Sequence, residues 1–491
     1  DRELIMEINK ILAEEFKLRQ EQVVNTVALI DDGKTIPFIA RYRKELTGSL
    51  DDQILRELSD RLTYLRNLEI RKSEVSSSIA EQGKLTEEIS SALDKAETLV
   101  EVEDIYRPFK PKRKTRASIA REKGLEVLAD LIGRQDDKLD LHNEAQKFIN
   151  VENGLETEEE VIQGASDIIA ENVSDDAELR KSIRKLYEKA AKIESRASDE
   201  NAETVYQNYY EFCEPVSKIA DHRILALDRG EKEGALKVSV SIDEEFCFSI
   251  AERKYVINNT DSGNIVKAAV QDSCKRLIMP SVEREIRAEL TARAAEGAIK
   301  VFSSNLRQLL LQPPIKNSVT LGLDPAYRTG CKIAVVDSIG KVLDTTVIYP
   351  TPPQKKIEEA KTKLKKLITK YGVTTIAIGN GTASRESEEF VAELIKEIPQ
   401  NVSYMVVSEA GASVYSASKL AAEEFPEYDV SLRSAVSIAR RLQDPLAELV
   451  KIDPKAIGVG QYQHDMPKAR MNEALSGGVE DCVNSVGVDL N

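Results

Sequence analysis

The stretch VTLGLDPAYRTGCKIAVVD, residues 319–337, marks a change in the chain from a helical period to a period of two. Apolar residues alternate with other residues from 319 to 323, and a second apolar run covers 331–337. This pattern predicts two β-strands, the first of which ends at Asp324. The proline pair Pro313-Pro314 precedes the change and ends the helical segment before it.

The segments that follow give the order of a complete domain. They predict a third strand at residues 341–348, a helix at 357–368, a strand at 374–378, a helix at 384–398 and a strand at 402–407. Further helices follow from about residue 411, and the last of them covers 430–442. A meander of three strands, then helix, strand, helix, strand and helix, is the order of an RNase H-like fold. The sequence therefore predicts an α/β RNase H-like domain at residues 315–445.

The chain before this domain is predicted to be mainly helical. Residues 1–215 show apolar stripes at helical spacing, such as Ile54, Leu58, Leu62 and Leu65. Their short helices and tight turns permit a helix-turn-helix, but they describe any helical domain equally well. Residues 216–314 are predicted to form a strand-containing segment followed by helices, with strands at 222–228 and 235–241 and helices over 262–311. The fold class is thus multidomain.

Composition limits what the chain binds. Its 491 residues have a formal net charge of -15, no tryptophan and only 5% aromatic residues. This charge opposes general adhesion to nucleic acid, so phosphate contacts must come from local basic patches. No segment is apolar and long enough for a membrane helix, and five scattered cysteines with three histidines offer no local metal motif. We expect a cytoplasmic protein with reduced thiols and no cofactor.

The end of the first strand is the predicted position of a nuclease site. RNase H-like nucleases hold two divalent ions there with three or four carboxylates, and Asp324 and Glu409 occupy two such positions. Asn380 follows the next strand, and Arg433 is expected where the third acid belongs, on the last helix. An arginine repels divalent ions, so it either neutralises the acids or holds a phosphate. We predict a catalytically degenerate site without a metal.

One segment is rich in cations. Lys110, Lys112, Arg113, Lys114, Arg116 and Arg121 lie within twelve residues of each other. Such a density predicts phosphate contact. A solvated face, or an anchor for acidic residues of the same chain, explains it equally well. Because the alternatives are balanced, these six cations are candidate nucleic-acid-binding residues.

Several long motifs resemble the Tex family of bacterial transcription accessory proteins. They include IPFIARYRKE from Ile36, YRPFKPKR from Tyr106, HRILALDRGEK from His222 and the run SIARRLQDPLAELVKIDP from Ser437. The resemblance spans essentially the whole chain. It implies a helical N-terminal region and a YqgF/RuvC-like domain. It also implies tandem helix-hairpin-helix motifs and a C-terminal OB-fold RNA-binding module.

The resemblance assigns residues 446–491 to a linker and the start of the helix-hairpin-helix region. The RNA-binding module would then lie outside this sequence. Members of the family commonly have glycine after the Asp-Pro pair, whereas this chain has Ala326-Tyr327, which crowds any metal beside Asp324.

These observations support three functions. The first is a transcription accessory scaffold that binds RNA or DNA, mainly through the C-terminal modules, and is not an enzyme. The second is a metal-dependent RuvC-like nuclease that uses Asp324, Glu409 and Asp429. The third is a protein-interaction platform for RNA polymerase.

Overall fold

The computed structural model describes residues 2–111, 114–199 and 201–486, which divide into two compact units. The first unit holds residues 1–34 and 43–295, and the second holds residues 35–42 and 296–491. The finer division predicted at residues 215, 314 and 445 remains a prediction.

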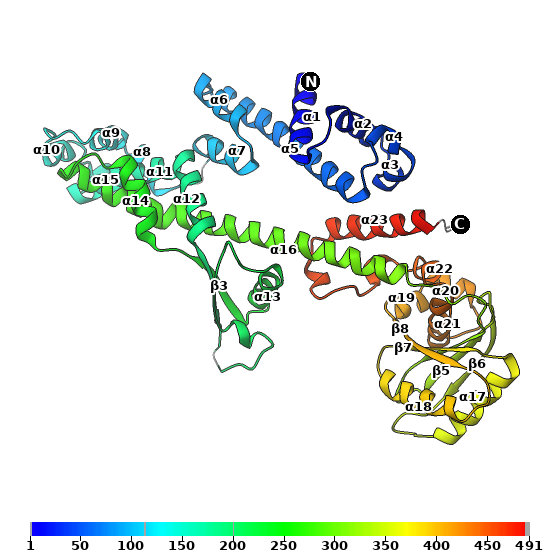
Figure 1. The fold of residues 1–491 in the computed structure, drawn as a ribbon. Coiled ribbons are helices and arrows are strands. Elements are labelled where there is room, and N and C mark those ends of the chain that lie inside the picture. The colour runs from blue at the N-terminus through cyan, green and yellow to red at the C-terminus, as the bar shows by residue number, and fades with distance from the viewer. Residues whose placement is uncertain (1, 112–113, 200, 487–491) are drawn as a thin grey trace. The chain divides into compact units, whose positions relative to one another are not determined.

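Helices dominate the first unit, as predicted (Figure 1). They are α1 Arg2–Phe16, α2 Gln20–Asp31, α4 Lys44–Thr47, α5 Asp52–Glu81, α6 Glu87–Lys95, α7 Leu99–Tyr106, α8 Arg116–Glu122, α9 Glu126–Arg134, α10 Leu141–Gln146, α11 Glu158–Ser174, α12 Ala177–Ala190, α13 Asp221–Lys232, α14 Glu244–Tyr255 and α15 Asp261–Asp272. A π-helical turn, Ser273–Ile278, leads into the long helix α16, Met279–Leu310, whose residues up to 295 belong to this unit. In α5 the Asp51 side chain caps the first turn, and the predicted residues Leu58, Leu62 and Leu65 are buried.

A small antiparallel sheet interrupts these helices. Its strands are β1 Lys192–Ala197, β2 Glu211–Pro215 and β3 Leu236–Ser241, in the order β2-β1-β3. The strand predicted at 235–241 is confirmed as β3. The sequence did not predict β1 and β2, because they are short and carry charged residues on their exposed face.

The prediction of a strand at residues 222–228 is wrong. These residues belong to helix α13, in which Ile224 and Leu227 are buried one turn apart. Residues 224–227 are all buried, and all four are apolar. An apolar run this short shows neither the period of two that is typical of a strand nor the period of 3.6 that is typical of a helix. Gly230 then packs closely on Leu236 of β3, and this contact places the helix against the sheet.

The second unit contains the predicted RNase H-like domain. Its strands and helices are β4 Thr320–Asp324, β5 Cys331–Val336, β6 Val342–Ile348, α17 Ile357–Tyr371, β7 Thr375–Gly379, α18 Ser384–Lys396, β8 Ser403–Val407, α19 Ala412–Ser416, α20 Lys419–Glu424, α21 Val430–Gln443 and α22 Pro445–Leu449. The strand order is β6-β5-β4-β7-β8, with β4, β7 and β8 parallel and β5 antiparallel to both neighbours. Helices α3 Ile36–Tyr42 and α23 Lys468–Val486 also belong to this unit.

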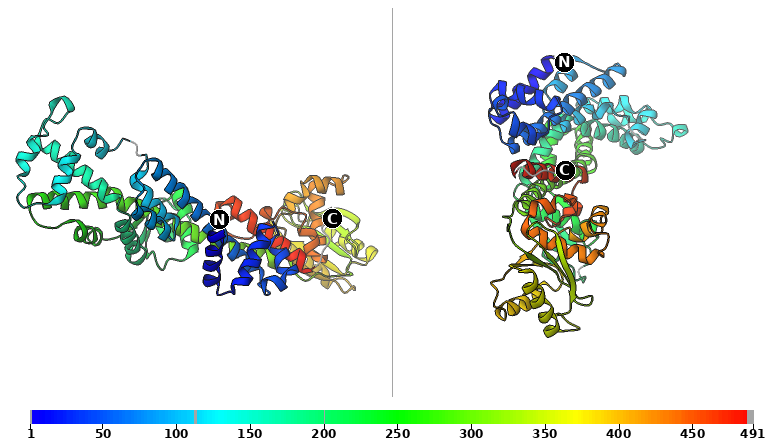
Figure 2. Two further views of the ribbon diagram at one scale, coloured as in Figure 1. Left: turned by 90° about the horizontal axis from the view of Figure 1, so that it is seen from above. Right: turned by 90° about the vertical axis from the view of Figure 1, so that its right-hand side faces the viewer.

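This sheet is covered on both faces, with α17 and α18 on one side and α21 on the other (Figures 1 and 2). Residues of β4, β5 and β7 are therefore almost continuously buried, which explains their apolar sequences. Helix α21 approaches β4 so closely that a Cβ at Gly322 would overlap the carbonyl oxygen of Ala435 and lie 2.9 Å from Cβ of Ala439. Only glycine permits this approach.

We predict that Gly322→Ala destabilises the second unit by about 1–3 kcal/mol, because the added methyl pushes α21 away from β4. The midpoint of urea unfolding, followed by circular dichroism, measures the loss. Gly133→Ala is the matched control, since Gly133 lies in α9 with no atom within 4 Å of the added Cβ. Alanine there should be neutral or slightly stabilising. Equal effects of both variants would contradict the tight contact.

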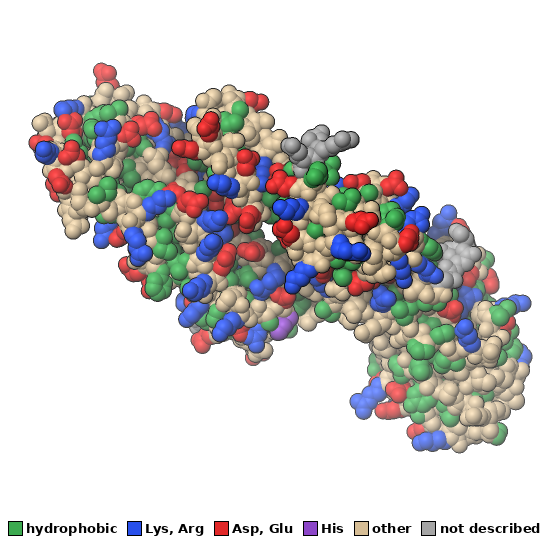
Figure 3. All heavy atoms as spheres, turned by 45° about the horizontal axis from the view of Figure 1, so that its top comes forward, with side chains coloured by type: hydrophobic (Ala, Val, Ile, Leu, Met, Phe, Trp, Pro, Cys, Tyr) green, Lys and Arg blue, Asp and Glu red, His purple; other side chains and the backbone are tan. Residues whose placement is uncertain are grey.

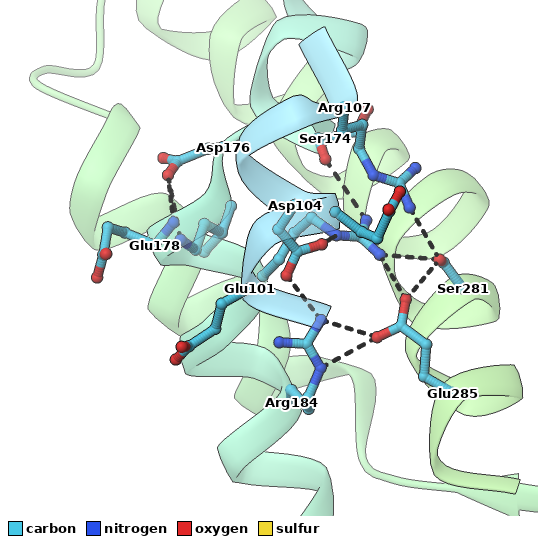
Figure 4. Close-up of polar contacts among 12 residues, drawn as sticks. Glu101, Asp104, Arg107, Ser174, Asp176, Glu178, Arg184, Ser281 and Glu285 are labelled. Atoms are coloured by element: carbon cyan, nitrogen blue, oxygen red, sulfur yellow. Dashed lines mark hydrogen bonds and ion pairs between the residues drawn. The ribbon is translucent and has the colours of Figure 1, made fainter. Parts of the chain in front are cut away.

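A buried ion-pair network joins three helices of the first unit (Figure 4). Arg180 of α12 has no exposed surface, and its Nε donates to Asp104 Oδ1 of α7 at 2.8 Å. Its Nη2 donates to Glu285 Oε1 of α16 at 3.0 Å and to Ser281 Oγ at 2.8 Å. Arg184 donates to the second oxygens of Asp104 and Glu285, each at 2.8 Å. Although burial works to raise the pKa of Glu285, the contacts with Arg184 and Arg180 hold it below its ordinary value.

We predict that Arg180→Met costs about 3–5 kcal/mol of stability, because it removes one of the two guanidinium groups that Asp104 and Glu285 share and leaves Arg184 alone against both carboxylates. Arg66→Met is the control. Arg66 pairs with Asp31 at the surface of the same unit, where both side chains are more than a third exposed, and its loss should cost less than about 1 kcal/mol. Urea unfolding compares the two variants, and similar losses would show that the buried network adds no particular stability.

Candidate functional site

Two carboxylates meet at the carboxyl ends of the parallel strands of the second unit. Asp324 is the last residue of β4, and Glu409 follows β8 by two residues. Strand β7 lies between β4 and β8 and ends at Gly379. A Cβ at Gly379 would lie 2.5 Å from Glu409 Oε2, so the missing side chain makes room for this carboxylate above the end of β7. Tertiary folding therefore brings together the two acids that the sequence singled out.

The two carboxylates influence each other. Burial raises the pKa of Asp324, and a hydrogen bond from Ser434 and the charge of Lys332 oppose this rise only in part. Burial also raises the pKa of Glu409, and the negative charge of Asp324 adds to the rise. Since burial disfavours the ionised form of each acid, positive charges nearby are needed to stabilise the two carboxylates.

Two buried cations supply this compensation, and sequence reasoning missed both. Lys332 of β5 lies opposite Asp324 in the strand register, and its Nζ donates to the carbonyls of Thr329 and Gly330 at 2.8 Å. Arg441 of α21 is only 2% exposed. Its Nη1 donates to the carbonyls of Ser408 at 2.9 Å and Ala410 at 2.7 Å, which flank Glu409.

Arg441 is the more strongly perturbed of these two cations. Burial lowers its pKa to about 10, although the charges of Glu448 and Glu409 act in the opposite direction. A guanidinium with that pKa remains protonated at neutral pH. Arg441 therefore keeps a fixed positive charge beside Glu409 and also holds the loop that carries this acid.

The structure corrects the predicted role of Arg433. Its Nε donates to the carbonyl of Phe425 at 3.1 Å and its Nη1 to the carbonyl of Ser416 at 3.3 Å, so it is directed to backbone rather than to the acids. The residue of α21 that contacts Asp324 is its neighbour Ser434. A shift of one residue turns a helix by about 100°, which explains the error.

The remaining candidates of the site have structural roles. The exposed Asn380 accepts a hydrogen bond on Oδ1 from the backbone N–H of Glu409 at 3.0 Å, so it also supports this acid. Asp429 caps α21, because its Oδ1 accepts from the N–H of Leu432 at 2.8 Å. Within residues 2–111, 114–199 and 201–486, no three His, Cys, Asp or Glu side chains gather in a way that could hold a metal ion.

The basic segment separates into residues with different surroundings. Lys110 forms an ion pair with Glu103, and its Nζ lies 5.5 Å from the centre of the Tyr106 ring. Arg121 pairs with Glu171 and donates to Asn172 Oδ1 at 2.9 Å. These two cations thus anchor acidic and polar neighbours in the same chain.

Two further cations of this segment, Lys114 and Arg116, are exposed to solvent. Lys112 and Arg113 lie outside the described residues. On the face that Figure 3 shows, Lys and Arg side chains are interspersed with Asp and Glu rather than gathered into one broad basic surface. A phosphate group that binds this face must therefore contact a few neighbouring cations rather than an extended basic surface.

Comparison with known proteins identifies the family. Three family models match this chain: a Tex-like protein N-terminal domain at residues 6–80, a Tex central region-like domain at 136–302 and a Tex protein YqgF-like domain at 318–443. The transcriptional accessory protein Tex of Neisseria gonorrhoeae is 45% identical over 99% of this chain and 64% of its own length. This chain belongs to the Tex family.

Other relatives of this Tex-family chain come from distant organisms. The uncharacterized protein YdcI of Bacillus subtilis is 51% identical over 98% of the chain and 67% of its own length. The human S1 RNA-binding domain-containing protein 1 is 37% identical over the whole chain and 51% of its own length. The chain therefore spans about two thirds of the length of its bacterial relatives and about half of the length of the human one.

Within its described part, no helix combines the length and apolar character that a membrane crossing requires.

We predict that Asp324→Asn raises the midpoint of thermal unfolding at pH 7–8. Because the folded-state pKa of Asp324 is raised, the ionised acid costs stability above that pKa, and an amide removes this cost. The gain should disappear below about pH 4, where the acid is protonated in both the folded and the unfolded states.

Asp344→Asn is the control for this experiment. Asp344 lies in β6 of the same domain and accepts a hydrogen bond from Tyr371 at 2.9 Å. Burial works to raise its pKa, but this bond and its other contacts hold the pKa below its ordinary value. Asn should therefore destabilise at neutral pH, and this loss should shrink as the pH falls through the folded-state pKa. We expect the two variants to change the stability at neutral pH in opposite directions. A destabilised Asp324→Asn variant at neutral pH would contradict the raised pKa of Asp324.

Proposed function

We propose that this chain is the non-catalytic scaffold of a transcription accessory protein, with an RNase H-like domain that does not hydrolyse nucleic acid. The observation that carries the proposal is the pair of buried cations beside the two acids. Lys332 and Arg441 supply fixed positive charge where a nuclease of this fold uses divalent ions. Ser434, rather than a third acid, meets Asp324 from α21.

The competing proposal is a metal-dependent RuvC-like nuclease that recruits Asp429 as a third ligand. The position of Asp429 argues against it, since this side chain is engaged in capping the helix. Two magnesium ions would also have to bind near the guanidinium of Arg441 and the ammonium of Lys332, which repel them. We therefore favour the scaffold.

We predict that the purified chain does not cut single-stranded, double-stranded or branched DNA or RNA in the presence of magnesium or manganese. The assay compares the chain with its Asp324→Asn variant, prepared in parallel. Any trace cleavage should be equal in both preparations and thus reveal a contaminant. Metal-dependent cleavage that Asp324→Asn abolishes would establish the nuclease instead.

Nucleic-acid contact is the second part of the proposal. The name of the human relative indicates an S1 RNA-binding domain, and this chain covers only half of that protein. We infer that the complete protein binds RNA or DNA mainly through further modules, in association with the transcription machinery and RNA polymerase. This chain adds a weaker contact through the exposed Lys114 and Arg116, together with Lys112 and Arg113.

We predict that replacing Lys112, Arg113, Lys114 and Arg116 with serine weakens the binding of the chain to RNA and DNA. Each phosphate contact contributes roughly 0.7–0.9 to the log–log salt slope, so losing all four should flatten the slope by roughly 3–4. Fluorescence anisotropy at several salt concentrations measures both quantities, and circular dichroism confirms folding.

A variant with Arg134, Lys341, Arg385 and Lys419 replaced by serine is the charge-matched control, because these side chains are also exposed. It should bind nearly as the parent chain does. If the two variants behave alike, the segment has no specific role in binding nucleic acid. The platform for RNA polymerase then becomes the better proposal.

A further inference from the structure

The first unit has a groove on the surface between α6, α7 and the start of α12, with a volume of about 1080 Å³. Its floor consists of apolar side chains that are only partly covered by the core beneath them, namely Ile89, Ile105 and Phe109. The more exposed Ala92 and Pro108 extend this floor. Helices α5, α6 and α7 thus leave one side of their hydrophobic core accessible.

The walls of the groove are held in place by ion pairs and hydrogen bonds. Glu101 of α7 pairs with Lys181 of α12 at 2.7 Å, and Asp104 is bonded to Arg180 in the buried network. The Nζ of Lys72 on α5 donates to the carbonyl of Asp94 on α6 at 3.1 Å. A groove whose walls are fixed in this way loses little conformational entropy when it is occupied.

The rim is strongly acidic. Seven carboxylates but only two ammonium groups line the groove, at Glu87, Glu88, Glu101, Asp104, Asp175, Asp176 and Glu178 against Lys95 and Lys181. Contacts within the chain engage several of these acids, since Asp176, for example, pairs with Lys254. Glu87, Glu88 and Glu178 form no ion pair within the described residues, and all three are exposed.

We propose that this groove docks a basic amphipathic helix of a partner protein. Apolar residues on one face of such a helix would cover Ile89, Ile105 and Phe109, and flanking lysines or arginines would meet Glu87, Glu88 and Glu178. The acidic rim repels phosphate, so nucleic acid and anionic membranes do not fit this surface. The groove is therefore distinct from the basic segment that begins at Lys110, and this inference does not depend on nucleic-acid binding by that segment.

The test uses the full chain and a fluorescent peptide of about 14 residues, with leucine at helical spacing and lysine elsewhere. Anisotropy should show saturable binding that weakens with salt. The variant Glu88→Lys/Glu178→Lys should raise Kd roughly tenfold, because attraction at the rim becomes repulsion. Two control peptides, one with glutamate for lysine and one with serine for leucine, should bind far more weakly.

The matched control is Glu21→Lys/Glu245→Lys, which has the same change in net charge. Both glutamates are exposed and lie in the first turns of α2 and α14, as Glu88 and Glu178 lie in those of α6 and α12. This control should leave Kd within about twofold, since only the general charge changes. Equal weakening by both pairs, equal binding of the serine peptide, or no saturable binding would overturn the proposal, whereas the nucleic-acid assays would be unaffected.

Discussion

The close approach of α21 to β4 is the constraint on which the candidate site depends. Because Gly322 has no side chain, the helix backbone lies directly on the central strand of the sheet. This fixes which residues of α21 face the strand ends, with Ser434 at Asp324 and Arg441 under the loop of Glu409. The electrostatic character of the site thus follows from a packing contact between two backbone segments.

The site and the first unit balance buried charges in different ways. Around Arg180 and Arg184, two guanidinium groups share two carboxylates across three helices, with nearly every polar atom bonded. Around Asp324 and Glu409, the cations instead donate to backbone carbonyls and act on the acids mainly through their charge. The first arrangement joins helices, whereas the second leaves the two acids together without a shared cation between them.

The distribution of charge separates the surfaces that different partners would use. The acidic groove has an apolar floor that includes Phe109. The basic segment begins at the next residue in the sequence, Lys110. The two lie next to each other in the first unit but favour ligands of opposite charge. A net charge of -15 therefore hides two local surfaces that composition alone does not reveal.

The sequence by itself determined the helical first part, the order of strands and helices in the RNase H-like domain and the two acids of its site, because periodicity and strand ends are local properties. It misplaced residues 222–228, where a short buried run shows no period, and it missed β1 and β2. Only the tertiary structure decided that Ser434 rather than Arg433 meets Asp324, that Lys332 and Arg441 compensate the acids, and that Lys110 and Arg121 are engaged within the chain. These facts depend on the rotation of a helix and on contacts between residues far apart in the sequence, which local patterns do not encode.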